Sequence, residues 1–472
     1  GKTLDRKNAL RARRADHGPP HGRRAAQAAH LAARGLRVLA LEQHALGHGF
    51  GSSHGLTRII RLAYFEDPSY VPLLRRAFAL WRELQDGLDE PLLHVTGGLD
   101  VGTAGSVVFE GSLRSCREHD LPHEVLDATA LAARFPGWRP AANAMAVYQP
   151  DAGFLTPERC IQAYAHRARS LGADIRTGER VLSYTSGGGR VRVRTDRGEY
   201  EAGQLVLTAG PWMRELAPAL RPLLSPERQV LGWFDVADRA QFAPQAFPVF
   251  VLEAEEGTYY GFPEYGVPGF KIGRYHHLDE RVHPDTVDRA CHPRDEAALR
   301  EAVSRYFPAA NGALRSSAVC MFTNTPDEHF IIDRAPDAPE VLLVSPCSGH
   351  GFKMSSVIGE ICAEASGHGI CVPANFNATE QVVISGEVAA VEAEAAEVSL
   401  EVGPPLAVRF AVTRLRVVSG EAIAAAFLII AAAGKTIVVI GVATCRTAVM
   451  KDVAKCRTIV AIGVATCKII VV

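Results

Sequence analysis

An alanine-rich helix followed by a short apolar strand constrains the fold of this chain more than any other segment. Residues 25–35, AAQAAHLAARG, combine strong helix formers with Gly35, which suits the position just past a helix end. Residues 36–42, LRVLALE, then predict a buried strand that ends in an acid, Glu42. A helix, a tight turn and an apolar strand form the second half of a βαβ unit, which predicts a parallel sheet.

The remaining chain alternates between two kinds of segment. Residues 156–181 and 203–212 predict further helix and strand elements of the parallel sheet, the second ending in a turn at Gly210. Residues 228–236 and 257–277 instead predict strands and turns of a separate sheet. Because a chain of 472 residues is long enough for two or three domains, we expect two interleaved domains.

The composition excludes several other classes of protein. Apolar residues make up 47% and charged residues 22%, which is typical of globular domains, and a net charge of −1 attracts neither nucleic acid nor an anionic membrane. The ten cysteines form no C-x-x-C pair and follow no secretory signal, so we expect neither a disulfide framework nor a metal site. These features favour a cytoplasmic protein that acts on small molecules.

Residues 1–24 differ from the rest and are predicted to be an aberrant N-terminal segment. Residues 10–24, LRARRADHGPPHGRR, carry many arginines and two adjacent prolines, a composition typical of loops. A dinucleotide-binding unit needs a glycine fingerprint here, but the three glycine positions fall near Pro19, His21 and Arg24. This mismatch predicts weakened contact with a diphosphate group.

Four residues stand out from the pattern alone, and each has a purely structural alternative. Glu42 suits the acid that accepts hydrogen bonds from a ribose, although strands often end in solvated acids. Arg58 and Arg61, three residues apart in GSSHGLTRIIRLAY (51–64), would share a helical face and point at an anion or a flavin ring, or else form a solvated helix start. Cys320 is either a reactive thiol or a small buried hydrophobe.

Four segments resemble, in order and spacing, the monomeric sarcosine oxidase and N-methyltryptophan oxidase family. GSSHGLTRIIRLAY and the following YFEDPSYVPL (64–73) resemble the family's G-S-H-H-G-D-T-R-I-I-R-H-A-Y segment. YGFPEYGVPGFKIG (260–273) resembles its oxygen-activating lysine segment, and CMFTNTPDEHFIID (320–333) its covalent flavin attachment site. SGHGFKMSS (348–356) resembles its carboxylate-binding loop. The resemblance covers about residues 25–366.

The resemblance implies the α/β fold of FAD-dependent amine oxidoreductases. This fold has a discontinuous, Rossmann-like FAD domain and an antiparallel β-sheet substrate domain. In this sequence, the FAD domain would comprise residues 25–90, 150–215 and 320–371, and the substrate domain residues 91–149 and 216–319.

The resemblance also implies roles for single residues. Cys320 would carry FAD through a thioether bond, and Arg61 and Lys353 would clamp the substrate carboxylate. Arg58 and Lys271 would lie against the flavin, where Lys271 would hold a water near N5 and favour electron transfer to oxygen. The residues implied to line the reacting centre are Tyr260, His276, His350 and His54. Those implied to contact the cofactor are Glu42, Ser52, Ser53, Thr57, Gly210, Gly349, Phe352 and Lys353.

Three positions depart from the family pattern. Ser53 replaces the first histidine of the family's histidine pair, and Phe322 stands where relatives have tyrosine. One extra residue in KIGRYHH leaves open whether His276 or His277 lines the pocket. Cys347, beside the carboxylate-binding loop, is interpreted as structural.

The implied reaction is oxidative demethylation, in which sarcosine, O₂ and H₂O give glycine, formaldehyde and H₂O₂. A bulkier N-methyl or cyclic imino acid, such as N-methyltryptophan or pipecolate, is the alternative substrate. The missing glycine fingerprint also leaves open a flavin-deficient protein that is not an enzyme. The expected partners are a small secondary amino acid and O₂, with neither nucleic acid nor membrane.

Residues 372–472 form a second atypical region. They contain apolar strands and a near-repeat, GKTIVVIGVATCR (434–446) against CRTIVAIGVATCK (456–468), whose glycines and β-branched residues argue against a transmembrane helix. We interpret this region as a β-rich or disordered tail outside the catalytic fold. Truncation after about residue 371 is therefore expected to leave flavin content and activity intact, and the chain to be a monomer unless the tail self-associates.

Overall fold

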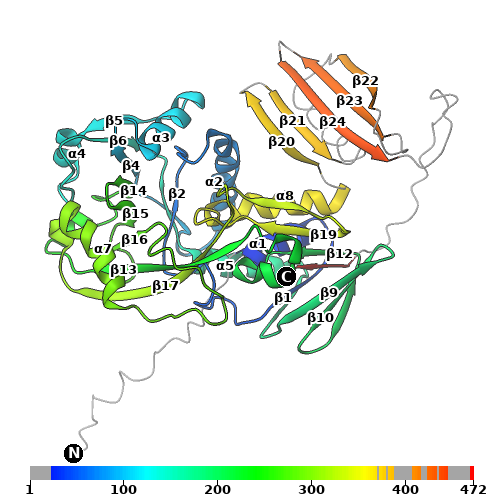
Figure 1. Ribbon diagram of the computed structural model, residues 1–472, viewed down its shortest axis with the longest axis horizontal. Coiled ribbons are helices and arrows are strands. Elements are labelled where there is room, and N and C mark those ends of the chain that lie inside the picture. Colours follow the sequence, from blue (N-terminus) through cyan, green and yellow to red (C-terminus); the bar gives the residue numbers. More distant parts are fainter. Residues whose placement is uncertain are drawn as a thin grey trace, which may run out of the picture.

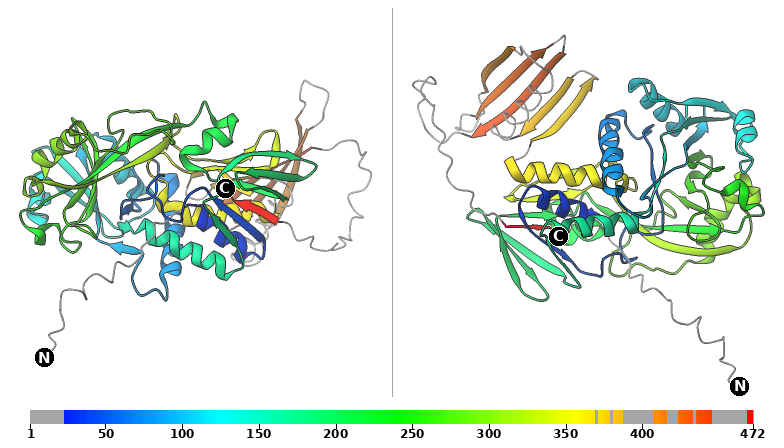
Figure 2. Two further views of the ribbon diagram at one scale, coloured as in Figure 1. Left: turned by 90° about the horizontal axis from the view of Figure 1, so that it is seen from below. Right: turned by 180° about the vertical axis from the view of Figure 1, so that it is seen from behind.

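The structure is a computed structural model (Figure 1) that describes residues 23–368, 371–378, 381–386, 407–415, 423–432, 435–444 and 468–471. One six-stranded and one eight-stranded sheet dominate it, and each is built from segments far apart in the sequence. A separate five-stranded sheet lies beside α8 (Ser355–His368), outside both (Figure 2). Within the described residues, we find no helix long and apolar enough to cross a bilayer.

The helix and strand predicted near the beginning of the sequence are both present. α1 (Arg23–Ala33) ends at a cap in which Gly35 has a φ of +76°, the left-handed conformation that glycine adopts without strain. This cap reverses the chain into β1 (Arg37–Glu42). The alanines of α1 permit close packing, since a Cβ added to Gly359 of α8 would lie 2.9 Å from the backbone of Ala26.

The six-stranded sheet has the order β18-β19-β12-β25-β1-β8, and only the β18–β19 pair is antiparallel. Its residues alternate between two cores: Val38 and Ala40 join the core of α1, α5 and α8, while Leu39 and Leu41 join the core beneath strands β9–β11. The bounds are β8 (Asp174–Thr177), β12 (Gln204–Leu207), β18 (Ile331–Ala335), β19 (Ala338–Ser345), β25 (Lys468–Val471), α5 (Pro157–Ser170), β9 (Val181–Gly187), β10 (Arg190–Thr195) and β11 (Glu199–Ala202). This arrangement confirms the predicted Rossmann-like sheet.

The eight-stranded sheet forms the second large unit and has the order β17-β13-β16-β15-β14-β4-β6-β5. Its strands pair antiparallel except β4 with β14. An aromatic core that includes Phe234, Phe250 and Phe270 lies between it and α7. The bounds are β4 (Gly98–Thr103), β5 (Glu124–Asp127), β6 (Ala144–Gln149), β13 (Ser225–Phe234), β14 (Val249–Ala254), β15 (Gly257–Phe262), β16 (Phe270–Arg274), β17 (Leu314–Asn324), α3 (Val107–Glu118), α4 (Ala128–Arg134) and α7 (Pro293–Tyr306).

A small sheet carries the arginine segment, and it corrects one prediction. Arg58 lies in strand β2 (Arg58–Ile60), and Arg61 follows it directly, so the predicted helical face shared by the two arginines is wrong. Residues three apart in a strand point to opposite faces, which sends the two side chains to different parts of the site. The neighbouring elements are β7 (Gly153–Leu155), β3 (Leu93–Val95) and α2 (Val71–Gln85).

Short helices complete the described elements and occupy the connections between strands. They are η1 (Pro68–Tyr70), η2 (Gly210–Trp212), α6 (Met213–Leu216), η3 (Pro218–Leu220), η4 (Arg239–Phe242), η5 (Pro308–Ala310) and η6 (Phe352–Met354).

The region after residue 371 divides between two sheets. The five-stranded sheet consists of β20 (Cys371–Ala378), β21 (Gln381–Gly386), β24 (Lys435–Thr444), β23 (Ile423–Ala432) and β22 (Ala407–Leu415), in this spatial order. Strand β25, in contrast, lies inside the six-stranded sheet, between β12 and β1. The sequence predicts that all of residues 372–472 lie outside the catalytic fold, but β25 belongs to the six-stranded sheet, because pairing with distant strands leaves no local pattern. Truncation after residue 371 therefore removes a strand of this sheet, and the expectation that it leaves the flavin content intact no longer follows.

Candidate active site

Cys320 lies on β17, the edge strand of the eight-stranded sheet that pairs with β13. Its side chain packs with Trp233, and 3% of the residue is exposed. Burial raises the pKa of the thiol above its usual value, while Arg58, Lys271 and Arg289 act in the opposite direction. The three cations therefore offset only part of the effect of burial, and the thiol form of Cys320 is favoured in this structure.

Lys271, on β16, is buried and fully hydrogen-bonded. Its Nζ donates to Gly55 O at 2.6 Å, to Thr57 O at 3.1 Å and to Thr57 Oγ1 at 2.7 Å. Burial, followed by repulsion from Arg58, lowers the pKa of the amine well below its usual value. All three donors of the ammonium form have protein acceptors, so holding a water requires the exchange of one of these bonds.

The loop at residues 51–57 wraps around both cations. Arg58 donates to two carbonyl oxygens of this loop, each at 2.8 Å. Gly55 has a φ of +99°, and an added Cβ would lie 3.9 Å from the Lys271 Nζ. Glu158 of α5 fixes the loop, since one of its oxygens accepts the Gly55 N–H at 2.7 Å and the next N–H at 3.0 Å. Glu158 was not predicted as a site residue, because it acts on the backbone of a segment far away in the sequence.

Two residues of this loop carry buried polar atoms that have no hydrogen-bond partner among the described residues. They are Ser52 Oγ and His54 Nε2, with the partly buried Ser53 between them. Burial, followed by the charge of Arg58, lowers the pKa of His54 to about 3, so its ring is neutral at physiological pH. A flavin ring carries both hydrogen-bond donors and acceptors, and the residues at this end of the site therefore fit the predicted cofactor.

The predicted adenosine contacts lie at one edge of the six-stranded sheet. Glu42, at the end of β1, is 5% exposed and accepts a backbone N–H at 3.0 Å. Gly210, after β12, has a φ of +57°, and no atom lies within 4 Å of an added Cβ. A cavity of about 180 Å³ lies near these positions but is lined by their neighbours Leu41, Gln43 and Ala209 and not by Glu42 or Gly210. This end of the site suits FAD because an acid and a small residue lie at the carboxyl ends of two parallel strands.

The predicted mismatch in the glycine fingerprint falls outside the residues whose side chains the structure describes. Pro19 and His21 precede the first described residue, and the side chain of Arg24 is not among the described ones.

The two predicted anion-binding residues meet at one aromatic ring. The Arg61 guanidinium lies 4.6 Å from the centroid of the Tyr64 ring, and the Lys353 Nζ lies 5.1 Å from the same centroid. Both side chains are buried. Arg61 also donates to both oxygens of Glu66, at 2.9 and 3.1 Å, and its Nε lies 3.7 Å from Asp100 Oδ1. This cluster provides two cations for an anionic group, of which Arg61 is paired with Glu66 and Lys353 donates to His350 O at 2.9 Å.

Glu66 and Asp100 are site acids that the sequence did not predict. Burial by itself would raise the pKa of Glu66, but Arg61, His350 and Lys353 hold it below its usual value. Burial raises the pKa of Asp100 to about 6, against the opposing effect of Arg61. Asp100 faces Arg61 from β4, an element that only the fold brings close, whereas Glu66 lies in the YFEDPSYVPL segment, five residues after Arg61.

His350 is a neutral histidine with a defined tautomer. Its Nε2 lies 2.9 Å from Glu328 O, and since a carbonyl oxygen only accepts, Nε2 carries the proton. Its Nδ1 therefore accepts the Tyr64 hydroxyl at 2.5 Å. Burial lowers the pKa of His350 to about 4, which agrees with a neutral ring. His350 thus holds the Tyr64 ring against the two cations.

Aromatic side chains form the wall near Cys320. The Tyr260 and Tyr275 ring centroids are 5.1 Å apart, and the Phe322 centroid lies 5.9 Å from that of Tyr275. Gly349 has a φ of +78°, and an added Cβ would lie 2.7 Å from Phe322, so this position requires glycine. Tyr275 had no predicted role, because it lies within KIGRYHH, where one extra residue leaves the match to the family open. Phe352, a predicted cofactor contact, instead stacks on Trp81 in the core, with ring centroids 6.0 Å apart.

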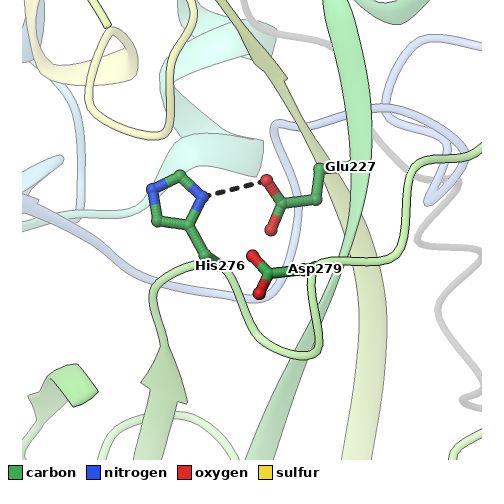
Figure 3. Close-up of side chains that lie close together, drawn as sticks. All are labelled: Glu227, His276 and Asp279. Atoms are coloured by element: carbon green, nitrogen blue, oxygen red, sulfur yellow. Dashed lines mark hydrogen bonds and ion pairs between the residues drawn. The ribbon is translucent and has the colours of Figure 1, made fainter.

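His276 lies between two acids, as Figure 3 shows for Glu227. Its Nδ1 is 2.9 Å from Glu227 Oε2, and its Nε2 is 3.0 Å from Glu328 Oε1. The hydrogen bonds to Glu227 and Glu328 raise the pKa of His276 to about 10, so the ring is an imidazolium at neutral pH. Asp279 brings a third carboxylate near, but with both nitrogens bonded the ring has no lone pair for a metal.

His277, the other histidine of the pair, belongs to the interior of the eight-stranded unit. It is 1% exposed, and its Nε2 lies 3.1 Å from Asp295 Oδ1, which in turn pairs with Arg228 at 2.8 Å. Of the two histidines left open by the sequence, only His276 therefore lies on the side of Glu328 and Tyr275.

The fold and the site define a flavin-dependent oxidoreductase, and comparison with known proteins agrees. Residues 25–365 match the family described as DAO, FAD dependent oxidoreductase, and the chain belongs to this family. The predicted class of enzyme, an FAD-dependent amine oxidase, and the predicted fold are thereby confirmed.

The similar proteins include amino acid oxidases of known type. Monomeric sarcosine oxidase of Bacillus sp. (strain NS-129) is 40% identical over 71% of this chain and 88% of its own length. N-methyl-L-tryptophan oxidase of Salmonella heidelberg is 36% identical over 70% of this chain and 88% of its own length. Among solved structures, the open form of NikD, an amino acid oxidase of nikkomycin biosynthesis, has a TM-score of 0.63 at 25% identity and covers 74% of this chain and 92% of its own.

Proposed function

We propose that the chain oxidises a small secondary N-methyl amino acid, most simply sarcosine, and holds FAD through Cys320. The observation that carries this proposal is the pair of buried cations, Arg61 and Lys353, that both contact the Tyr64 ring. The names of the similar enzymes, sarcosine oxidase and N-methyl-L-tryptophan oxidase, support the same class of substrate.

The chain's own residues supply binding and electrostatics. Arg61 and Lys353 bind the substrate carboxylate, and two charge-assisted contacts fix its orientation and reject amines without an acid group. Bound FAD supplies the acceptor for the hydride equivalent that leaves the N-methyl carbon. Arg58 places a positive charge beside Cys320, and the ammonium form of Lys271 adds a second one; together they stabilise the negative charge that develops as oxygen is reduced. The reaction balances as sarcosine, O₂ and H₂O to glycine, formaldehyde and H₂O₂.

Neither His276 nor His350 is available as a base for the substrate amine. His276 is protonated between its two carboxylates, and His350 already accepts the Tyr64 hydroxyl, so neither ring is a free base. Since only the neutral amine donates a hydride equivalent readily, turnover is expected to rise with pH.

Peroxide formation with a panel of amines tests the substrate. We expect sarcosine to give the highest kcat/KM, and N-methylethylamine, which lacks the carboxylate, a value at least about 100-fold lower, as expected for the loss of a charged contact of about 3 kcal/mol. N-methyltryptophan and pipecolate complete the panel. A higher kcat/KM for either of these would assign the alternative substrate, and equal values for N-methylethylamine and sarcosine would remove the role of the cation pair.

Acid precipitation tests the attachment of FAD. We expect the flavin to stay with the precipitated protein in the unmodified chain and in Cys347→Ser, which alters another buried cysteine. In Cys320→Ser the flavin should pass to the supernatant. Flavin retained by Cys320→Ser would exclude this cysteine as the attachment point. A protein isolated without any flavin would support the flavin-deficient alternative.

A further inference from the structure

Strand β25 occupies the central position of the nucleotide-binding sheet. Neighbouring strands run β8, β1, β25, β12 and β19, all parallel. In a doubly wound sheet of order 3-2-1-4-5, position 1 belongs to the strand that precedes the first helix. Here β1 and β8 fill positions 2 and 3, and β12 and β19 fill positions 4 and 5. A strand from far beyond the catalytic segments therefore stands in position 1.

The pairing of β25 is continuous on both sides. Lys468 to Val471 align with Arg37 to Ala40 of β1, and Ile469 to Val471 align with Gln204 to Val206 of β12. Val471 is completely buried and joins the core formed by α1, α5 and α8. Since β-strands lie about 4.8 Å apart, the slot between β1 and β12 is about 10 Å wide and admits one strand.

The slot determines the geometry of the adenosine end of the site. Glu42 ends the strand on one side of β25, and Gly210 follows the strand on its other side. α1 runs antiparallel to β1 through a short turn, so the N-terminal end of α1 lies at this same edge of the sheet. Ligands of doubly wound sheets bind at this edge, where the strand order reverses. The spacing between Glu42 and Gly210 is thus set by the strand between them.

We propose that the slot between β1 and β12 is a strand-acceptor site, that its occupant is the chain's own Lys468–Val471 segment, and that FAD is retained only when the slot is filled. The composition of the segment suits the slot, because Ile469, Ile470 and Val471 are β-branched and apolar, as both faces of a buried parallel strand require. Unpaired backbone on β1 and β12 would otherwise open the sheet at its centre. The inference rests on FAD binding by the family and not on the identity of the substrate.

A resembling strand provides a matched control. β24 begins KTIVV at Lys435, close to KIIVV at Lys468, but it pairs with β21 and β23 in the five-stranded sheet. Proline removes a ladder N–H, so Ile470→Pro in β25 and Ile437→Pro in β24 are equivalent lesions in different sheets. We expect Ile470→Pro to lower the flavin-to-protein ratio of the full chain at least about fivefold, and Ile437→Pro to leave it within about 20%.

Two further measurements keep the proposal open to refutation if Ile470→Pro is merely unstable. A synthetic peptide of residues 466–472 added to Ile470→Pro during reconstitution with FAD should restore flavin binding, and the same peptide with proline at 470 should not. In the unmodified holoprotein, amide hydrogens of residues 469–471 should exchange at least about 100-fold more slowly than unstructured amides. Unprotected amides, absent rescue, or equal flavin loss in Ile437→Pro would each overturn the proposal. Loss of flavin is measured without substrate, so a wrong substrate assignment would leave these results unchanged.

Discussion

Replacing Asp100 by asparagine should change the pH dependence of stability by a predictable amount. Asp100 is 1% exposed, and its Oδ2 accepts the Ser112 hydroxyl at 2.8 Å. Its Oδ1 has no hydrogen bond among the described residues and lies 3.7 Å from Arg61 Nε. Burial, only partly offset by Arg61, raises the pKa of this carboxyl from 3.8 to about 6. The folded protein thus holds the proton more tightly than the unfolded chain does.

The sign follows from this difference. Between pH 4 and 7 the unfolded chain releases the Asp100 proton first, so the free energy of unfolding falls as pH rises, until the folded group has also ionised. At about 1.4 kcal/mol for each pKa unit, a rise from 3.8 to about 6 corresponds to about 3 kcal/mol. Asparagine does not ionise, and Asp100→Asn should therefore gain about 2.5 kcal/mol relative to the unmodified protein between pH 4 and pH 7.5, because the rest of the change falls below pH 4.

Urea unfolding of the holoprotein at pH 4 and pH 7.5 measures this change. Comparing two pH values cancels any steric effect of the amide, which does not depend on pH. Asp151→Asn, at an exposed aspartate, serves as the control and should shift by less than about 0.5 kcal/mol. A difference between Asp100→Asn and the unmodified protein that is the same at both pH values would refute the reasoning.

Further predictions concern the cations of the site. Lys353→Met should lower kcat/KM for sarcosine by about 10- to 100-fold with unchanged flavin content, since a charged hydrogen bond contributes about 1.5–3 kcal/mol; an unchanged kcat/KM in the peroxide assay would exclude Lys353 from the clamp. In stopped-flow measurements, Lys271→Met should slow reoxidation of the reduced enzyme by O₂ about 100-fold, but should slow anaerobic reduction by substrate less than tenfold. A larger effect on reduction than on reoxidation would exclude the role of Lys271 toward oxygen. Because hydrogen bonds to Glu227 and Glu328 raise the pKa of His276 to about 10, the stability it contributes should be present below pH 6.5 and lost as pH rises through 10. His276→Gln should make the melting temperature depend less on pH across that range. If the variant and the unmodified protein show the same dependence on pH, the pairing of His276 with its carboxylates is not stabilising.

Local sequence patterns predict those parts of the fold that depend on neighbouring residues alone. The cap at Gly35 and the strand that ends in Glu42 follow from residues within a few positions of each other, and both are present. The Arg58 and Arg61 segment shows the limit of such patterns. Its spacing is compatible with a helix, but pairing with β7, about a hundred residues later, makes it a strand.

Resemblance to a family located the residues that carry chemistry, but not those that support them. The structure brings Arg61 and Lys353 together at the ring of Tyr64. Tyr64 lies inside the segment that resembles the family, but the sequence offered no reason to assign it a role. Glu158 and Asp100 act on those residues from other elements, through a loop backbone and through burial. Such partners depend on tertiary contact, and their positions in the sequence look like those of ordinary surface acids.

The position of β25 also has a consequence for the order in which the protein folds during synthesis. The strands on either side of the slot are made early, whereas β25, between them, is made after every other described strand. At roughly 5–20 residues per second, β1 and β12 wait for tens of seconds with unpaired inner edges. The eight-stranded unit, whose strands all precede β25 in the sequence, can assemble in that interval. We therefore expect the nascent chain to depend on chaperones until β25 has left the ribosome.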